Sequence, residues 1–385
     1  MSIKILIAPS GFKESLEADQ VADCIEKGIL LALPDAQTIK APLVDGGEGF
    51  TKALVAATNG ELHHITVTGP TAKPVQASYG YLGGSEPRTA VLEIASAAGL
   101  RLIPYENRDP LLTTTYGVGE IIKAVLNSDP EQILIGCGDS GTNDGGTGMA
   151  EALGARFLDS AGKQLKWGGG ELARLEKIDL SGLDSRLAGV DIDVACNWQN
   201  VLCGPRGVSR VYAAQKGAPP AMVEKLASAF ENLAGVIARD LGLDMCEMPG
   251  GGASGGLGAG LHAFLGARLH PRYDIITKYL DIEGLLKGSD LVFSAEGTID
   301  DQTPHGKIPT EIARRAKLYH LPVIVFAGSI GRNARSNLSH AIDSYVSIIN
   351  RPCTLPEAIE NTSEWLVNTA EQVMRTLMVG RKLAS

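Results

Sequence analysis

The chain has 385 residues, with 35 Lys and Arg against 44 Asp and Glu, which gives a formal net charge of −9 at pH 7. This length predicts two domains or one large one, and 44% hydrophobic residues are enough for a sizeable core. The acidic balance, without Lys/Arg stripes, excludes nucleic acids and anionic membranes as partners because nothing would neutralise their phosphates. No apolar run reaches the ~18 residues that a bilayer span needs. The composition therefore favours small-molecule chemistry.

Targeting and redox signals are weak. The first apolar run, residues 3–9, is short and has no small-residue cleavage pattern behind it, so we expect a cytoplasmic protein. Six cysteines are scattered without a CxxC pair, which predicts neither a disulfide framework nor a zinc site. The 46 glycines exceed ordinary usage and lie in clusters, which indicates loops approached closely by a ligand or by other backbone.

Strands and helices alternate at both ends of the chain. An apolar run at 3–8 predicts a strand, and apolar residues at every fourth position from Val21 to Leu33 predict a helix, with Ser15 as its cap and Pro34 as its stop. Further strands are expected at 38–43, 291–295, 323–327 and 345–349, with helices at 309–319 and from 356. This order indicates a parallel sheet covered by helices.

The middle of the chain has a different pattern. Three β-like segments, 63–68, 75–82 and 89–95, follow one another without helices, as in a meander. Later strands are expected at 132–135 and 192–196, and helices near 115–126, 146–153 and 219–241. We therefore predict an α/β protein with a discontinuous first domain, residues 1–66 and 286–385, and a second domain, 67–285, inserted into it.

Five polar glycine loops follow predicted strands or precede helices. They are PSGFK (9–13), VDGGEG (44–49), GCGDSGTNDGG (136–146), GGGASGGLGAG (250–260) and AEGTIDDQTPHGK (295–307). In parallel α/β sheets, ligands lie at the carboxyl ends of strands, where glycine lets backbone N–H groups approach phosphate oxygens. Acids in these loops suit Mg²⁺, and lysines suit a transferring phosphate. The loops predict a phosphate and cation site.

Each loop also has a structural explanation. Asp beside Gly commonly forms turns or caps helices, which applies to Asp45, Asp144 and Asp300. Lys13 is also explained as a solvated lysine, and the 250–260 loop by close helix packing. The DGGEG run is harder to explain in this way, because two glycines cost backbone entropy without filling a core.

One motif points to another class of enzyme. Glycines 136, 138 and 141 match GxGxxG after a predicted strand, with Asp159 about twenty residues on. Two carboxylates in the same loop would repel a pyrophosphate, which disfavours a nicotinamide-dependent oxidoreductase. Neither the P-loop pattern nor a serine-hydrolase elbow is matched.

These loops, with further segments between them, resemble the bacterial glycerate kinase family. The likeness runs nearly end to end and is carried by KILIAPSGFKESL, DGGEGF, VTGP (67–70), RDPLLTTTYGVGE (108–120), TNDGG, ALGARFLD, QKGA (215–218), GGLGA, EGTIDDQTPHGK and FAGS (326–329). The resemblance implies a glycerate kinase type I fold, in which a second α/β domain is inserted into a flavodoxin-like parallel-sheet domain. It also implies phosphorylation of D-glycerate, usually at the 2-hydroxyl, with ATP and Mg²⁺.

Transferred by position, the resemblance predicts a set of site residues. Catalytic roles fall on Asp45, Asp144 and Lys13, with Asp45 or Asp144 accepting the hydroxyl proton. Substrate and phosphate binding fall on Ser140, Thr142, Asn143, Asn200, Lys216, Gln302, Thr303 and Lys307, and metal binding on Glu48, Glu296 and Asp300. The expected partners are a small hydroxy acid and ATP, without nucleic acid or membrane, and a homodimer is left open.

Several positions depart from the family pattern. Ser10-Gly11 stands where the family typically has Asp-Ser, Asp139 replaces a small residue, Asn197 an Asp, and Thr298 an Arg. Because Arg is the natural bidentate partner of a carboxylate, its loss leaves two alternatives open. These are a kinase for a different small hydroxy acid and a catalytically inactive binding relative.

Overall fold

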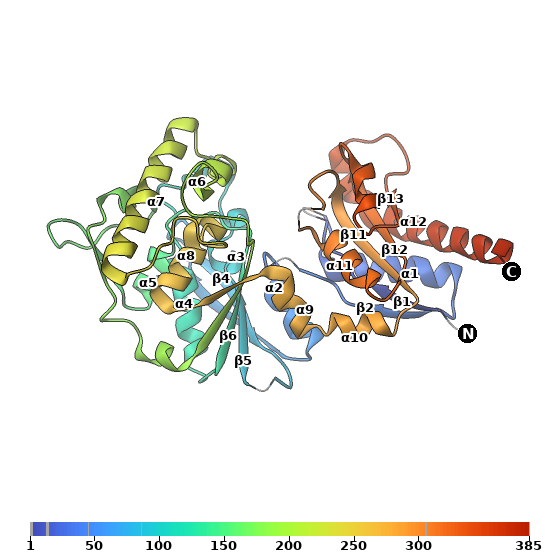
Figure 1. Cartoon of the computed structure of the whole chain (residues 1–385), viewed down its shortest axis with the longest axis horizontal. Helices are drawn as coiled ribbons and strands as arrows, with labels where there is room; N and C mark the ends of the chain where they lie inside the picture. Colours follow the sequence, from blue (N-terminus) through green and yellow to red (C-terminus); the bar gives the residue numbers. More distant parts are fainter. Residues whose placement is uncertain (1–2, 13–14, 45, 86, 305, 385) are drawn as a thin grey trace. The chain divides into compact units, whose positions relative to one another are not determined.

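The structure is a computed structural model that describes residues 3–12, 15–44, 46–85, 87–304 and 306–384. The fold divides into two compact units (Figure 1). The discontinuous unit comprises residues 1–44 and 276–385, and the central unit comprises residues 45–275. Among the described residues, no helix is both long and apolar enough to cross a membrane.

The discontinuous unit is built on a five-stranded sheet. Its strands are β1 (Lys4–Ile7), β2 (Gln37–Lys40), β11 (Leu291–Ile299), β12 (Val323–Ile330) and β13 (Ser344–Ser347). All pair in parallel, in the order β13-β12-β11-β1-β2. Counted within this unit, that is the 2-1-3-4-5 order of flavodoxin-like sheets, whose ligands bind where the order reverses, here between β1 and β11.

Helices cover this sheet because its strands are apolar on both faces. Ile5, Leu6 and Ile7 are all fully buried, as expected for a parallel strand between two layers. The helices of the unit are α1 (Ala18–Ala32), α10 (Ile282–Lys287), α11 (Ile308–Lys317) and α12 (Leu355–Ala384), with a 3-10 turn, η6 (Ala334–Ser339). Helices α1 and α12 lie side by side and share one core with β1, β11 and β12 (Figure 1).

The central unit contains a six-stranded mixed sheet. Its strands are β3 (Glu61–Thr68), β4 (Pro74–Tyr81), β5 (Thr89–Glu93), β6 (Gln132–Cys137), β9 (Asp191–Cys196) and β10 (Arg268–Pro271). The order is β10-β9-β6-β5-β4-β3, with β10, β9, β6 and β5 parallel and β4 and β3 antiparallel. The three segments predicted as a meander are therefore neighbours in this sheet.

The remaining elements of the central unit surround this sheet. Its helices are α2 (Phe50–Ala57), α3 (Ala95–Ala98), α4 (Tyr116–Leu126), α5 (Thr147–Ala152), α6 (Val208–Tyr212), α7 (Pro220–Leu241) and α8 (Ala253–Leu265). Shorter elements are the hairpin β7 (Arg156–Leu158) and β8 (Lys177–Asp179), and the 3-10 turns η1 (Leu100–Leu102), η2 (Tyr105–Asn107), η3 (Gly169–Arg174), η4 (Ser185–Gly189) and η5 (Ala214–Lys216). Helix α9 (Arg272–Tyr279) contains the second boundary between the units.

The unit boundaries differ from the predicted domain boundaries. The units divide at 44/45 and 275/276, whereas the sequence predicts 66/67 and 285/286. Strand β3 pairs with β4 along its whole length, from Glu61 opposite Tyr81 to Thr68 opposite Pro74, and α2 packs on β4 and β5. Segment 45–66 therefore belongs to the central unit by its pairing, which the sequence pattern of that segment does not reveal.

The start of α1 also differs in detail from the prediction. Its cap is Glu17, which forms a reciprocal capping box with Gln20, and Ser15 instead donates a hydrogen bond to the carbonyl of Ile359. Helix α1 therefore begins at Ala18, three residues after the predicted cap Ser15.

Candidate active site

The carboxyl edge of the central sheet brings together the loops after β5, β6 and β9. Glu93 at the end of β5 pairs with Gly136 of β6, and Cys137 at the end of β6 pairs with Cys196 of β9. The polar loops 138–146 and 197–200 therefore begin side by side at one edge of the sheet. This is the edge at which parallel α/β sheets bind ligands.

Residues 46–49 of the DGGEG motif pack against the ends of these strands. A Cβ added to Gly46, whose φ is 82°, would lie 2.9 Å from the carbonyl oxygen of Ala195. The glycine is therefore required by close approach of backbone to backbone. Buried Glu93 holds the loop from below, because its two carboxylate oxygens accept hydrogen bonds from Gly49 N (3.1 Å) and Thr51 N (2.9 Å).

Sequence reasoning missed Glu93, although a signal existed. It ends the buried strand TAVLE, which is apolar at its three central positions, and is 6% exposed. A carboxylate at the end of a buried strand needs partners, and here the partners are the N–H groups at the start of α2. The loop that carries Glu48 is positioned by this cap.

Asp144 is fully buried and fully engaged by hydrogen bonds. Its Oδ2 accepts from Thr115 N (2.7 Å), Thr115 Oγ1 (2.9 Å) and Gly148 N (3.3 Å), and its Oδ1 accepts from Gly146 N (3.2 Å). Burial raises the pKa of the carboxyl, and these hydrogen bonds partly offset the rise. The side chain thus ties together the starts of α4 and α5, which favours a positioning role over the predicted acceptance of a proton.

Lys216 lies buried against the loop that follows β6. Its Nζ donates to Ser140 Oγ (2.9 Å) and to the carbonyl of Thr142 (2.7 Å), and no ion pair of Lys216 exists within the described part of the chain. Burial lowers the pKa of this ammonium to about 7, although the charges of Asp144 and Cys137 act in the opposite direction. Four of the predicted binding residues therefore form one cluster, which is Ser140, Thr142, Asn143 and Lys216.

Asn143 has no hydrogen-bond partner for either amide atom within the described residues, although the residue is 0% exposed. Thr142 Oγ1 is also buried and unpartnered there. An unsatisfied buried polar group costs about 1–3 kcal/mol, so native proteins rarely leave one without a function. These atoms are the strongest indication of a ligand in the central unit.

The 250–260 loop packs on this cluster. Gly255 has a φ of 71°, and a Cβ added there would lie 1.9 Å from the carbonyl oxygen of Thr142. A Cβ added to Gly260 would likewise lie 2.4 Å from the carbonyl oxygen of Gly145. Of the two explanations left open by the sequence, close packing therefore accounts for these glycines.

The GxGxxG match in the same region has a packing explanation as well. A Cβ added to Gly138 would lie 2.8 Å from Gly47 Cα, and one added to Gly141 would lie 2.5 Å from Ile103 Cδ1. Helix α5 begins at Thr147 rather than directly after the first glycines, as a dinucleotide fingerprint requires.

Glu48, a predicted metal ligand, forms an ion pair with Arg101. Its backbone N–H donates to Asp139 Oδ2 at 3.2 Å, and Asp139 adopts a left-handed φ of 49°. Asp139, one of the departures from the family pattern, therefore holds the DGGEG loop. Asn200, on the loop after β9, accepts a hydrogen bond from the Tyr212 hydroxyl at 3.1 Å.

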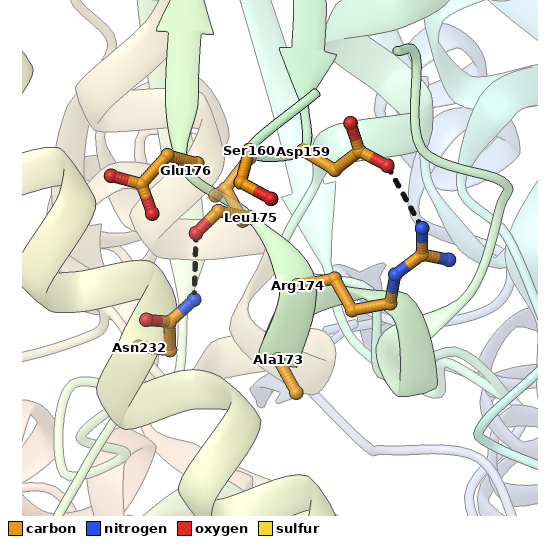
Figure 2. A pocket seen from close by; sticks show the side chains of 7 residues that line it. All are labelled: Asp159, Ser160, Ala173, Arg174, Leu175, Glu176 and Asn232. Carbon is orange, nitrogen blue, oxygen red and sulfur yellow. Dashed lines mark hydrogen bonds and ion pairs between the residues drawn. The ribbon is translucent and has the colours of Figure 1, made fainter. Parts of the chain in front are cut away.

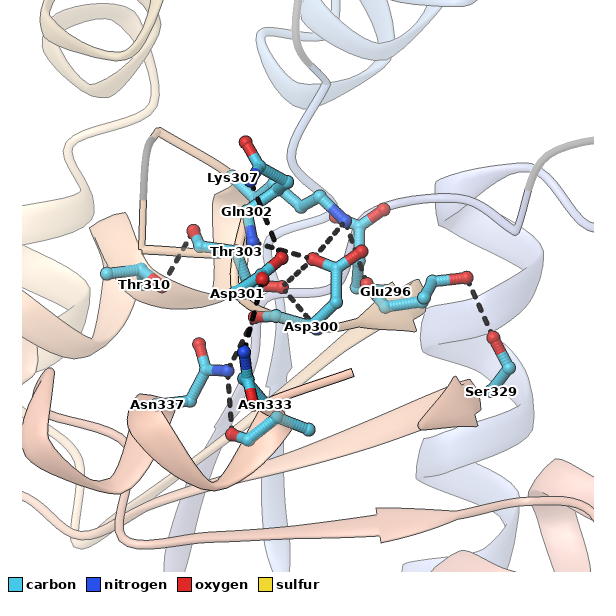
Figure 3. A network of polar contacts seen from close by, with 12 residues as sticks. Glu296, Asp300, Asp301, Gln302, Thr303, Lys307, Thr310, Ser329, Asn333 and Asn337 are labelled. Atoms are coloured by element: carbon cyan, nitrogen blue, oxygen red, sulfur yellow. Dashed lines mark hydrogen bonds and ion pairs between the residues drawn. The ribbon is translucent and has the colours of Figure 1, made fainter. Parts of the chain in front are cut away.

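In the discontinuous unit, the loop after β11 forms a polar network around Asp300 (Figure 3). Asp300 Oδ1 accepts from Gln302 N (3.0 Å), Thr303 Oγ1 (3.2 Å) and Lys307 Nζ (3.5 Å). Lys307 Nζ also donates to the carbonyl of Thr298 at 2.9 Å. The predicted residues Asp300, Gln302, Thr303 and Lys307 therefore lie together, and no hydrogen bond to Asp300 Oδ2 comes from the described residues.

The switch point of the same sheet carries Ser10 and Glu296. Ser10 Oγ, on the loop after β1, lies 2.8 Å from the carbonyl oxygen of Ala295 and 3.1 Å from Glu296 Oε2. Thr298, where the family typically has Arg, shares a hydrogen bond of 2.8 Å with Ser329 Oγ. The end of β11 thus offers a carboxylate and a hydroxyl but no guanidinium at position 298.

The predicted set is divided between the two units. Ser140, Thr142, Asn143, Asp144, Lys216, Asn200 and Glu48 lie in the central unit, and Glu296, Asp300, Gln302, Thr303 and Lys307 lie in the discontinuous unit. Lys13 and Asp45, both predicted as catalytic, fall outside the described residues. Among the residues that are described, no three His, Cys, Asp or Glu side chains form a group that could hold a metal ion.

A hollow of about 290 Å³ lies elsewhere on the central unit, beside η3 and α7 (Figure 2). Polar side chains of its lining pair with one another, since Arg174 pairs with Asp159 at 2.8 Å and Asn232 donates to the carbonyl of Leu175 at 3.0 Å. It contains none of the predicted site residues, and its paired lining gives no indication of a ligand.

Comparisons with known proteins identify the family. A sequence profile described as "Glycerate kinase family" matches residues 5–378. The chain belongs to the glycerate kinase family. It is 44% identical over 382 residues to "Glycerate 2-kinase" of Escherichia coli (strain K12), which covers 99% of this chain and 100% of the relative. It is 43% identical over 381 residues to "Glycerate kinase" of Bacillus subtilis (strain 168), with 99% of each chain covered.

A solved structure agrees with these sequence matches. A structure described as a glycerate kinase 2, from Salmonella typhimurium LT2, is 46% identical with a TM-score of 0.84 and covers 99% of this chain and 100% of its own. The glycerate kinase fold predicted from the sequence is thus confirmed, as is the prediction of a phosphotransferase with an alcohol group as acceptor.

Proposed function

We propose that this glycerate kinase family member transfers the γ-phosphoryl group of ATP to the 2-hydroxyl of D-glycerate, with Mg²⁺ as the required cation. The observation that carries the proposal is the buried cluster of Ser140, Thr142, Asn143 and Lys216 at the carboxyl edge of β6. Unpartnered amide and hydroxyl atoms in a fully buried site suit a small, highly polar acceptor. They do not suit an apolar ligand.

We assign the phosphate and cation chemistry to the loop after β11. Mg²⁺ takes one or two carboxylates together with substrate phosphates, so Asp300 Oδ2 and the Glu296 carboxylate fit the ion without a dedicated protein cage. The ion supplies charge neutralisation to the transferring phosphoryl group. Lys307, next to Asp300, contributes a second positive charge.

The remaining roles follow from what is left available. Asp144 is engaged in four hydrogen bonds and holds the loop that carries Asn143. Asp45 therefore remains the proposed acceptor of the hydroxyl proton, and Lys13 a proposed stabiliser of phosphoryl charge. We further propose a cytoplasmic location.

The test is ADP release from ATP with D-glycerate, measured over a range of Mg²⁺ concentrations. We expect Asp300→Asn to lower kcat/KM roughly 100-fold or more and to raise the Mg²⁺ concentration for half-maximal rate, since it removes a metal-binding charge. The matched control is Asp301→Asn, because Asp301 is adjacent and, among the described residues, its carboxylate accepts only long hydrogen bonds, from Gln302 Nε2 (3.4 Å) and Asn333 Nδ2 (3.5 Å). Equal rates in the two variants would remove Asp300 from the proposal.

A second candidate function is phosphorylation of a different small hydroxy acid. It is favoured by two departures from the family pattern. Thr298 stands in place of an Arg and shares a hydrogen bond with Ser329. Asn197 stands in place of an Asp and accepts a hydrogen bond from the Gln199 N–H. The same assay with a panel of hydroxy acids decides between the two. D-glycerate giving the highest kcat/KM would eliminate this candidate.

A further inference from the structure

The surroundings of the Lys216 side chain are unusual for a lysine. Its ammonium group is buried, donates to two uncharged oxygens and has no carboxylate within ion-pair distance among the described residues. An ammonium has three N–H donors, and two of them are used by the described residues, which leaves the third for a ligand. A buried charge is normally paired, because desolvation is otherwise uncompensated. The surroundings of Lys216 therefore have the chemical character of an anion site.

The adjacent amide supplies the matching hydrogen-bonding groups. Lys216 Nζ binds the carbonyl of Thr142, and the next residue is Asn143, with both its Nδ2 donor and its Oδ1 acceptor unpartnered within the described chain. A 2-hydroxy acid carries a carboxylate, which accepts hydrogen bonds, beside a hydroxyl, which donates one. An amide can satisfy both groups at once.

We propose that Lys216 and Asn143 form the carboxylate subsite of the enzyme: the acid's carboxylate pairs with Lys216 Nζ and accepts from Asn143 Nδ2, while Asn143 Oδ1 accepts from a substrate hydroxyl. This inference rests on the proposed function, since it names how the acceptor acid is held.

The proposal predicts that binding takes up a proton. The charges that act on Lys216 are those of Asp144 and Cys137, and Arg108 packs its backbone and Cβ against the neighbouring Gly217. Because burial holds the pKa of Lys216 at about 7, the free enzyme carries a largely neutral lysine at pH 8. A bound carboxylate raises that pKa, so the acid binds together with a proton at pH 8 and without one at pH 6.

The closing experiment is calorimetric titration of D-glycerate into the full chain at pH 6 and pH 8, with and without a non-hydrolysable ATP analogue. Buffers of different ionisation enthalpy report the protons taken up. We expect close to one proton at pH 8 and close to none at pH 6, with affinity falling as pH rises above 7. Equal uptake at the two pH values, no uptake at either, or no binding under either condition would overturn the proposal. Glycerol, which lacks the carboxylate, should not bind with proton uptake.

Variants identify the group that takes up the proton. Lys216→Met should abolish uptake and weaken D-glycerate binding about 30-fold or more, with nucleotide affinity changed less than about twofold, as for removal of one partner of a buried charge pair. Asn143→Ala should lower the affinity for D-glycerate about tenfold but leave the proton uptake at pH 8 unchanged. The control is Lys225→Met on the exposed face of α7, expected to behave as wild type.

Three outcomes separate this inference from the proposed function. If Lys216→Met weakens binding of the nucleotide and not of D-glycerate, the anion is a nucleotide phosphate and the proposed carboxylate subsite is wrong. If D-glycerate binds with proton uptake but no ADP is released, the subsite stands and the kinase proposal fails. If Lys216→Met does not fold, proton uptake by the wild-type chain and the Asn143→Ala affinity still decide the proposal.

Discussion

Asp144 shows how far residue type alone can mislead. As an Asp next to glycines in a strand-following loop, it was predicted equally well as a turn residue or as a general base. In the structure, three backbone N–H groups and one hydroxyl point at its carboxylate, which leaves little capacity for a substrate proton. The sequence cannot reveal this, because Thr115 is 29 residues away along the chain.

Replacing Asp144 tests the two roles directly. Asp144→Asn turns one acceptor oxygen into a donor that faces backbone N–H groups, so we expect a loss of about 2–4 kcal/mol in the free energy of unfolding. The kcat of the folded fraction, measured at about 15 °C, should fall less than about tenfold. Urea unfolding and ADP release on the same samples give both quantities. Thr115→Val, which keeps the backbone donor, is the graded control and should cost about 1 kcal/mol.

The opposite pattern would restore the catalytic assignment. An Asp144→Asn variant with wild-type stability and a kcat reduced roughly 100-fold or more would identify the carboxylate as the proton acceptor.

At the scale of elements, the carboxyl edge of the central sheet is organised by acids that cap helices. Glu93 ends β5 and caps α2, and Asp144 joins the starts of α4 and α5. In each case a carboxylate accepts from the N–H groups that a helix start leaves without intrahelical partners. Glu93 and Asp144 therefore fix loops that carry the proposed binding residues.

Glu93→Gln should loosen the DGGEG loop without unfolding the unit. An amide has one acceptor oxygen where the carboxylate has two, so one of the Gly49 and Thr51 N–H groups loses its partner, at about 1–3 kcal/mol of local stability. Hydrogen exchange followed by mass spectrometry should show that peptides covering 46–57 exchange faster in the variant than in wild type. Exchange of peptides covering β6 should change less. Glu61→Gln, on the exposed start of β3, is the control. Unchanged protection of 46–57 would show that Glu93 does not hold the loop.

For the whole molecule, the sequence predicted local elements well and long-range relations poorly. Apolar periodicity located β1, α1, α7 and the β3–β5 meander within a few residues. The assignment of 45–66 to a unit depended on the pairing of β3 with β4, and three-residue strands such as β7 have too little pattern to detect. Lys216 was found only through the family resemblance, because nothing in QKGA shows that its side chain is buried.

The same buried lysine should leave a signature in the stability of the whole chain. Its pKa is about 7 when folded and near 10.4 when unfolded, so between these values the unfolded chain binds more protons. Stability contributed by this site therefore rises with pH, by at most about 1.4 kcal/mol per unit between about pH 7 and 10, and is lost as pH falls towards 7.

Other groups titrate in the same range, including Cys137, whose pKa burial raises to about 11, so the informative quantity is the difference between wild type and Lys216→Met. In urea unfolding at pH 7, 8 and 9, the free energy of unfolding of wild type should rise relative to that of Lys216→Met as the pH rises. Saturating D-glycerate should flatten this dependence, because a lysine paired with a carboxylate stays protonated across the range. A difference independent of pH in the free enzyme would mean that Lys216 is already charged there, and the predicted uptake of a proton on binding of D-glycerate would be wrong.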